Sequence, residues 1–156
     1  MPAKLTIKDV LERACQKEIV SQLLYKDLAQ RMKKAEVAGA FKELVEQELG
    51  HQLILEKLIN GDITEGALNP GDVVDYKIVE RLDQPEVTTD MKLKDVFMLA
   101  AHREKASHEL YLGLSRIHPR GQVGELLKTL AAQELEHKRR VEFLYTEVAF
   151  PQTDGG

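Results

Sequence analysis

Two copies of one short pattern, a glutamate followed three residues later by a histidine, occur as Glu48-Leu49-Gly50-His51 and as Glu134-Leu135-Glu136-His137. On an α-helix, residues three apart lie on the same face, so each copy can direct a carboxylate and an imidazole at one small volume. Carboxylate oxygen and imidazole nitrogen together are ligands for transition metals. The two copies therefore predict a metal site.

A further glutamate precedes each copy by the same distance. Glu18 lies 30 residues before Glu48, and Glu104 lies 30 residues before Glu134, so the two halves are offset by 86 residues. The same offset aligns other identical residues without a gap: Ala14 with Ala100, Ser21 with Ser107, Tyr25 with Tyr111, Gln47 with Gln133, Leu49 with Leu135, Glu56 with Glu142, and Leu58 with Leu144. Such long-period similarity predicts a repeated unit, here a helical hairpin that is used twice.

The composition is that of an ordinary folded chain. Its 156 residues, 43% hydrophobic and 31% charged, suffice for one domain with a sizeable core. We expect residues 1–150 to form this domain and residues 151–156 to fray. The formal net charge of −4, without a basic block, disfavours nucleic acid or an anionic membrane as a partner.

The cellular location and the possibility of a disulfide are inferred from leader, apolar-run and cysteine patterns. Neither a charged-then-apolar leader nor a run of about 18 apolar residues occurs. We therefore expect a cytoplasmic protein that does not enter a membrane. The single Cys15 excludes a disulfide within the chain, and we interpret it as a small buried apolar residue.

Four amphipathic helices are expected. The first begins after Thr6, a candidate N-cap with Asp9 in the first turn, and runs to about residues 31–34. The second follows a turn near residues 33–34, the third starts near Leu93 and ends before His118, and the fourth fades at residues 150–151. In each helix, one glutamate interrupts a stripe of apolar residues that recur at helical spacing.

Helical periodicity fails between the second and third helices. Chain-breaking residues accumulate there, namely Gly61, Gly66, Pro70, Gly71 and Pro85. We interpret residues 61–92 as a long connection between the two hairpins. Asp72 is a candidate cap for a short helix whose apolar face carries Val74, Ile78 and Leu82, and this face is expected to pack on the bundle or on a second subunit.

Four glutamates at core-facing positions require a compensating charge. Ionised carboxylates buried together repel one another and lose their hydration. Two divalent cations would balance the four negative charges. The sequence therefore predicts a dinuclear site whose ligands are Glu18, Glu48, His51, Glu104, Glu134 and His137. Mixed oxygen and nitrogen ligands favour iron or manganese over calcium, while zinc remains an alternative because it binds such ligands tightly.

Two tyrosines lie on the same face as the outer glutamates. Tyr25 and Tyr111 follow Glu18 and Glu104 by seven residues, which is two helical turns. Helical side chains lean towards the N-terminus, so the tyrosine hydroxyls can support the carboxylates as hydrogen-bond donors. The alternative interpretation is that both are ordinary core tyrosines.

Three further histidines fall outside the repeated pattern. His108 lies one turn beyond Glu104, but its repeat counterpart is Gln22, so we expect His108 to stay outside the metal site. His102 and His118 have no partner at a ligand spacing.

The six predicted ligands form the set that ferritin-like di-iron and di-manganese bundles carry. Over about residues 5–150, the chain resembles the rubrerythrin-type branch of that superfamily. The resemblance implies an all-α four-helix bundle with a crossover along its length, and a di-iron centre that reacts with peroxide or dioxygen. It also implies that Glu48 and Glu134 bridge the metals, while Glu18 and Glu104 bind terminally and each histidine contributes one nitrogen.

Two departures from the rubrerythrin pattern stand out. Rubrerythrins carry an additional glutamate three residues after the ligand of the third helix, and Ser107 occupies that position here. They also usually carry a rubredoxin domain with four cysteines, whereas this sequence contains one cysteine. A ferritin-like centre without a rubredoxin domain describes the sequence best.

The predicted function is that of a non-haem di-iron oxidoreductase. Two Fe(II) ions are oxidised by hydrogen peroxide or oxygen, and an external electron donor restores them. One alternative is a ferroxidase or iron-storage protein, which requires a cage-like oligomer. Another is a helical interaction module with a structural metal, which folds fully after chelation. The expected assembly is a homodimer.

Overall fold

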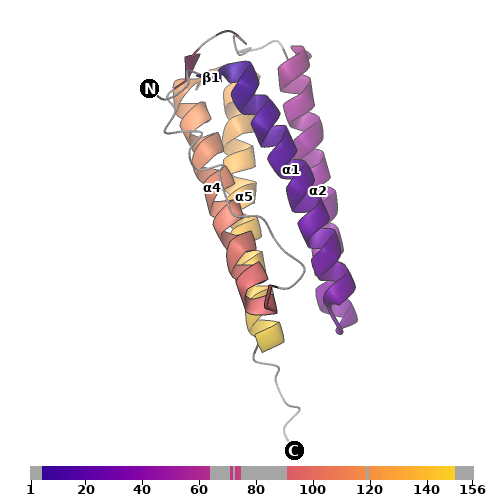
Figure 1. The fold of residues 1–156 in the computed structure, drawn as a ribbon. Helices are drawn as coiled ribbons and strands as arrows, with labels where there is room; N and C mark the ends of the chain where they lie inside the picture. The colour runs from indigo at the N-terminus through magenta and orange to yellow at the C-terminus, as the bar shows by residue number, and fades with distance from the viewer. Residues whose placement is uncertain (1–4, 64–70, 72, 75–90, 119, 150–156) are drawn as a thin grey trace, which may run out of the picture.

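The computed structural model describes residues 5–63, 71, 73–74, 91–118 and 120–149. Its long helices are α1 (Ile7–Arg31), α2 (Ala35–Asn60), α4 (Leu93–Ile117) and α5 (Gly121–Ala149). Helices α1 and α2 form one hairpin, α4 and α5 form the other, and the two hairpins lie side by side (Figure 1). The predicted all-α bundle of two hairpins is confirmed. The tail expected to fray, residues 151–156, lies outside the described residues.

Local signals explain where the helices of the first hairpin begin and end. Thr6 Oγ1 accepts a hydrogen bond from the backbone N–H of Asp9 at 3.2 Å, and Asp9 Oδ2 accepts one from the N–H of Thr6 at 3.1 Å. This reciprocal capping box confirms the predicted start of α1. Helix α2 ends at Gly61, whose φ of 74° lies in the left-handed region that favours glycine. The turn between α1 and α2 spans residues 32–34, as predicted.

Replacing Thr6 with alanine is expected to lower the free energy of unfolding by about 1 kcal/mol, because the N–H of Asp9 loses its acceptor. Denaturant unfolding of the chelated protein measures the change. Thr129→Ala is the matched control, since Thr129 lies exposed in the interior of α5 and bonds only the carbonyl of Glu125 within its own helix. An equal loss in both variants would contradict the capping role.

The connection between the hairpins contributes a short strand. β1 (Leu5–Thr6) pairs in antiparallel fashion with β2 (Val73–Val74). Val74, which the sequence predicts to be part of a short helix, is therefore extended, and this expectation is wrong at that residue. Asp72 and residues 75–90 lie outside the described residues. A two-residue strand is too short to leave an alternating pattern, so the sequence provides no signal for it.

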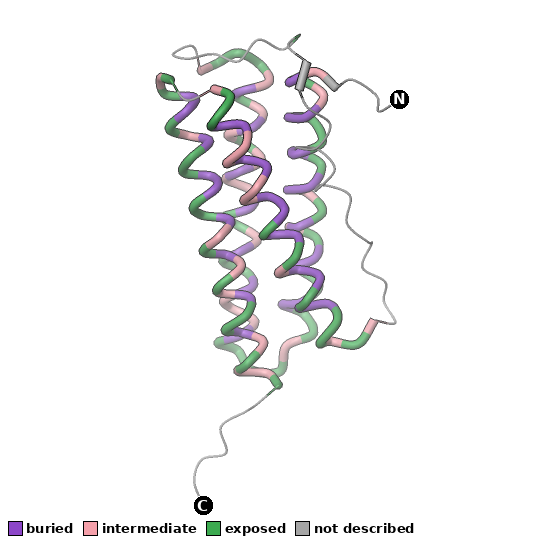
Figure 2. The backbone as a smooth tube through the Cα atoms, turned by 90° about the vertical axis from the view of Figure 1, so that its left-hand side faces the viewer, coloured by how far each residue is buried: buried purple, intermediate pink, exposed green. Residues whose placement is uncertain are grey.

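The apolar core divides into two clusters along the bundle. One contains Val10, Leu11, Ala14, Leu55, Leu58, Leu110, Leu114, Leu127 and Leu130, and the other contains Leu24, Leu28, Phe41, Leu44, Val96, Phe97, Val141 and Leu144. Buried positions face the interior on all four helices (Figure 2). Cys15 is buried in the first cluster as predicted, and burial raises the pKa of its thiol to about 11.

No helix among the described residues combines the length and the apolar composition needed to cross a membrane. In every helix the stretch between the two apolar clusters carries one buried glutamate. The bundle therefore places its four buried glutamates at one level, between two apolar layers.

Candidate metal centre

The structure brings all six predicted ligand side chains together at the level between the apolar clusters. They come from all four helices and are 0–3% exposed: Glu18 from α1, Glu48 and His51 from α2, Glu104 from α4, and Glu134 and His137 from α5. Within this set, the two glutamate–histidine pairs of α2 and α5 offer one ligand atom each, and these four atoms lie within 4.8 Å of one another. A common volume for metal ligation therefore exists between α2 and α5.

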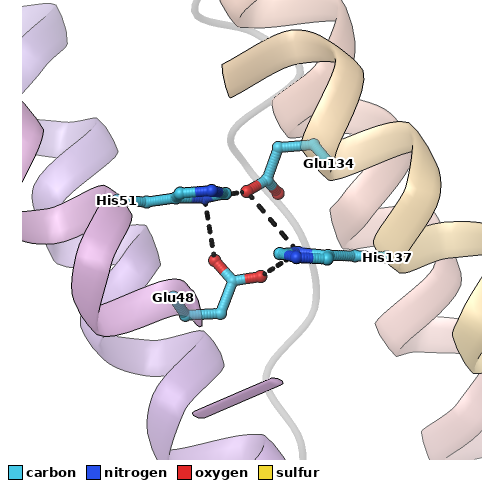
Figure 3. A group of neighbouring side chains, drawn as sticks. All are labelled: Glu48, His51, Glu134 and His137. Atoms are coloured by element: carbon cyan, nitrogen blue, oxygen red, sulfur yellow. Dashed lines mark hydrogen bonds and ion pairs between the residues drawn. The ribbon is translucent and has the colours of Figure 1, made fainter. Parts of the chain in front are cut away.

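Each histidine contacts the glutamate of the opposite hairpin. His51 Nδ1 lies 2.5 Å from Glu134 Oε1. His137 Nδ1 lies 2.8 Å from Glu48 Oε1. Within each helix the separation is larger, 3.6 Å from His51 Nδ1 to Glu48 Oε2 and 3.9 Å from His137 Nδ1 to Glu134 Oε1. The four side chains form a closed ring in which carboxylates and imidazoles alternate (Figure 3).

The two remaining glutamates approach this ring from α1 and α4. Glu18 Oε2 lies 3.8 Å from His51 Nδ1. Glu104 Oε2 lies 3.6 Å from His137 Nδ1. Each outer glutamate is therefore next to one histidine, whereas Glu48 lies near both histidines. Glu134 Oε1 likewise lies near both histidines.

The two tyrosines donate hydrogen bonds to the outer glutamates. Tyr111 Oη donates to Glu18 Oε1 at 2.6 Å, and Tyr25 Oη donates to Glu104 Oε1. Burial raises the pKa of both tyrosines well above its ordinary value, so the hydroxyls keep their protons. The partners lie on the opposite hairpin, because two helical turns separate each tyrosine from the glutamate of its own helix by about 10 Å.

A substitution of Tyr111 by phenylalanine is expected to leave Glu18 Oε1 buried without a donor. The loss should lower the stability of the metal-free protein by about 1–3 kcal/mol and weaken metal binding by about tenfold. Denaturant unfolding and a competition titration with a chelator measure the two effects. Tyr145→Phe is the control, since Tyr145 packs against Phe97 outside the cluster. Equal effects in both variants would argue for general packing instead.

The pKa values of the clustered side chains indicate that the cluster holds uncompensated negative charge. Burial, reinforced by the negative charge of neighbouring glutamates, raises the pKa of Glu48 and of Glu134 well above its ordinary value. Burial also lowers the pKa of His51. Burial raises the pKa of Glu104 too, but the neighbouring Glu134 and His137 side chains outweigh burial and lower this pKa below its ordinary value. Without a cation, the raised pKa values of Glu48 and Glu134 favour their protonated forms, which reduces the buried negative charge.

Three carboxylate oxygens in the cluster have no hydrogen-bond partner among the described residues, namely Glu18 Oε2, Glu48 Oε2 and Glu104 Oε2. Buried carboxylate oxygens normally have one. Each of these oxygens lies 3.6–3.8 Å from a histidine Nδ1, which is too far for a hydrogen bond. Two atoms that bind the same ion at about 2.1 Å are roughly 3–4 Å apart. The cluster therefore fits bound metal ions.

Sequence reasoning missed Gln47 and Gln133 as members of the site. Gln133 Oε1 lies 2.6 Å from His51 Nε2, and Gln47 Oε1 lies 2.6 Å from His137 Nε2. Both glutamines appear in the repeat alignment, but each contacts a histidine of the other hairpin. Such a contact depends on how the hairpins dock, so spacing along one helix does not reveal it.

Two other residues near the cluster have partners elsewhere. His108 Nδ1 lies 2.6 Å from the backbone carbonyl of Ala131, and this contact links α4 to α5. Ser107 Oγ donates to the backbone carbonyl of Arg103 at 3.1 Å. The hydroxyl at this position thus satisfies the backbone of its own helix.

Comparison with known proteins identifies a family and a fold for this chain. The rubrerythrin family model matches residues 9–145, a span that contains all six predicted ligands. A solved structure from Thermotoga maritima, provisionally assigned as a ferritin-like diiron-carboxylate protein, superposes with a TM-score of 0.73 at 22% sequence identity and covers 95% of this chain and 99% of that chain. This similarity establishes the ferritin-like fold. No curated protein matches the sequence. The chain belongs to the rubrerythrin family.

Proposed function

We propose that this protein is a di-iron oxidoreductase that reduces hydrogen peroxide or dioxygen with electrons from an external donor. The observation that carries the proposal is the set of three buried, unpartnered carboxylate oxygens around two histidine Nδ1 atoms. Membership of the rubrerythrin family supports iron over manganese or zinc. An oxygen-rich ligand set with two imidazoles suits iron as well.

The contacts of the metal-free cluster support distinct ligand roles. Glu48 directs one oxygen at each histidine, with Oε1 2.8 Å from His137 Nδ1 and Oε2 3.6 Å from His51 Nδ1. Glu134 Oε1 likewise lies near both histidines, at 2.5 Å and 3.9 Å. These two glutamates are therefore the proposed bridges. Glu18 and Glu104, each next to one histidine, are the proposed terminal ligands.

The six side chains would hold an iron pair, which when bound would supply the two electrons needed to convert hydrogen peroxide and two protons into two water molecules. The chain contributes the surroundings of this reaction. Apolar layers above and below the cluster exclude bulk water and strengthen the electrostatic interactions inside. Tyr25 and Tyr111 retain their protons and hold the outer carboxylates in place.

A ferroxidase is the second candidate. Ser107 favours it, because this hydroxyl is engaged with the carbonyl of Arg103 and stands where the rubrerythrin pattern has an additional carboxylate. Without that carboxylate, the centre resembles a plain ferritin-like site. A ferroxidase passes its oxidised iron on to a store, whereas an oxidoreductase retains it.

Anaerobic loading with Fe(II) followed by hydrogen peroxide separates the candidates. The oxidoreductase should bind two iron ions per chain, consume one peroxide per two Fe(II), and repeat the reaction when a reductant is added. A ferroxidase should accumulate more than two iron ions per chain in a cage-sized assembly on size-exclusion chromatography. Iron that stays ferrous after peroxide addition would contradict both and favour the interaction module.

Glu142→Gln is the matched control in this assay. Glu142 is exposed on α5 and pairs with Lys138. Its replacement changes the charge by the same amount as a ligand variant but should leave iron binding and oxidation unchanged. The size-exclusion run also tests the expected homodimer.

A further inference from the structure

Both ring nitrogens of each histidine in the cluster have a partner. His51 Nδ1 faces Glu134 Oε1 at 2.5 Å, while its Nε2 faces Gln133 Oε1 at 2.6 Å. In the second half, Nδ1 of His137 faces Glu48 Oε1 at 2.8 Å and Nε2 faces Gln47 Oε1 at 2.6 Å. Each imidazole is thus held on both sides by the opposite hairpin.

The glutamine contacts determine which nitrogen is available to a metal. An amide oxygen only accepts hydrogen bonds, so the Nε2 atom that faces it must carry the proton. In a neutral imidazole the lone pair then lies on Nδ1. Nδ1 is the nitrogen that faces the carboxylates in both copies. The opposite tautomer would direct an N–H into the cluster and leave no lone pair there.

Each histidine is contacted by two consecutive residues of the opposite hairpin, and the pattern is the same in both halves. Gln47 and Glu48 are consecutive on α2, and together they contact Nε2 and Nδ1 of His137 on α5. The repeat-related residues Gln133 and Glu134 on α5 contact Nε2 and Nδ1 of His51 in the same way. The tyrosines also donate to the opposite hairpin. The orientation of each imidazole therefore depends on correct docking of the two hairpins.

We propose that Gln47 and Gln133 are positioning residues that fix the tautomer and the ring orientation of the histidine on the opposite hairpin, so that Nδ1 binds the metal. This inference rests on the metal centre of the proposed function. Both side chains lie on the exposed side of their helices, so they act through the histidines and are not ligands themselves. Partners of ligating histidines typically contribute a factor of 10–100 to metal affinity.

Zinc(II) alone is a suitable probe, because it is diamagnetic and undergoes no redox chemistry. Gln47→Met and Gln133→Met preserve side-chain length but remove the acceptor. In a competition titration with a chelator, each variant should bind zinc about 10–100-fold more weakly than the unaltered chain. Circular dichroism checks folding, which the substitution of an exposed side chain should preserve. Unchanged zinc affinity would overturn the proposal.

Rescue by a second acceptor distinguishes positioning from packing. Gln133→Glu keeps an oxygen opposite His51 Nε2 and should retain zinc affinity. Because glutamate also adds a negative charge, Gln52→Glu is the matched control, since Gln52 neighbours His51 in sequence but bonds Gln22 and Glu56. Equal weakening by Met and Glu at position 133 would show that the acceptor is irrelevant, and would overturn the proposal.

Because each glutamine contacts the histidine of the opposite hairpin, replacing a glutamine should change the NMR signals of that histidine. In nitrogen NMR spectra of the zinc-loaded chain, both histidines should bind through Nδ1 and carry a proton on Nε2. Gln47→Met should perturb the signals of His137 more than those of the nearer-in-sequence His51. Zinc bound through Nε2, or a larger change at His51, would overturn the inference.

The two proposals fail in different ways. If the unaltered chain binds no zinc and no iron, the metal centre and this inference fall together. If the iron-loaded chain binds metal through Nδ1 but does not react with peroxide or dioxygen, only the proposed function fails.

Discussion

Replacing Glu48 with glutamine is expected to weaken metal binding at least about 100-fold and, in the same molecule, to stabilise the metal-free protein. The amide keeps the shape of the side chain but cannot offer an anionic bridge to two cations. Metal affinity is measured by chelator competition. Glu142→Gln, which removes an exposed charge from α5, should change neither property.

The stabilisation follows from the burial of Glu48. Burial raises its pKa well above the ordinary value of 4.5, so in the metal-free chain the ionised carboxylate opposes folding at any pH above this ordinary value. Above that pH the folded chain must either keep the buried charge or take up a proton, and both oppose folding. The neutral amide avoids this cost. Denaturant unfolding of the chelated variant should therefore show a stability gain that shrinks as the pH falls towards 4.5.

A stability loss in metal-free Glu48→Gln that persists at every pH would contradict this account. It would indicate that the carboxyl group contributes more by packing and hydrogen bonding than it costs by desolvation. The same experiment on Glu134 provides a second, independent copy, because burial raises its pKa in the same direction.

Loading the metal-free protein with Fe(II) under anaerobic conditions is expected to give the largest change in stability. An ion that binds only the folded state adds about 4 kcal/mol at a free concentration of roughly 1,000 times its Kd. For a chain of this size, this corresponds to an increase in Tm of about 8–16 °C per ion. Differential scanning calorimetry with and without metal measures the shift.

The expected effect is large because the cluster links the two hairpins. Polar contacts between them include the crossed pairs His51–Glu134 and His137–Glu48 at the centre, and Arg140–Glu43 on an exposed surface. A metal ion would replace protons in the central pairs with stronger ligand bonds. A shift of less than about 2 °C on loading would contradict a metal centre between the hairpins and favour the interaction module.

The internal repeat carried most of the architectural prediction. Equal 30-residue spacings from Glu18 to Glu48 and from Glu104 to Glu134 require each pair to lie level in an antiparallel hairpin, which places the turns near residues 33–34 and 119–120. In the structure, α1 ends at Arg31 and α2 begins at Ala35, while α4 ends at Ile117 and α5 begins at Gly121. Helical spacing is local and periodic, so one sequence suffices to read it.

Contacts between the hairpins could not be predicted from the sequence, because they depend on how one hairpin packs against the other. The sequence associates Tyr25 and Tyr111 with the glutamates on their own faces, but the hydroxyls bond the glutamates across the bundle. Gln47 and Gln133 were visible as repeat partners, yet nothing in their spacing marked them as partners of histidines. The pairing of β1 with β2 likewise joins segments that are almost 70 residues apart.

The amino-acid sequence by itself determined the four helices, their assignment to two equivalent hairpins, and the six side chains that converge at one level, because these features depend on helical periodicity and on the cost of burying charge. Only the tertiary structure decided which atoms face one another. It showed that each histidine contacts one glutamate and one glutamine of the opposite hairpin, and that the tyrosine hydroxyls bond glutamates across the bundle. It also showed that three carboxylate oxygens of the cluster have no hydrogen-bond partner among the described residues. These depend on the rotation and register of one hairpin against the other, which side-chain packing sets and linear spacing does not encode.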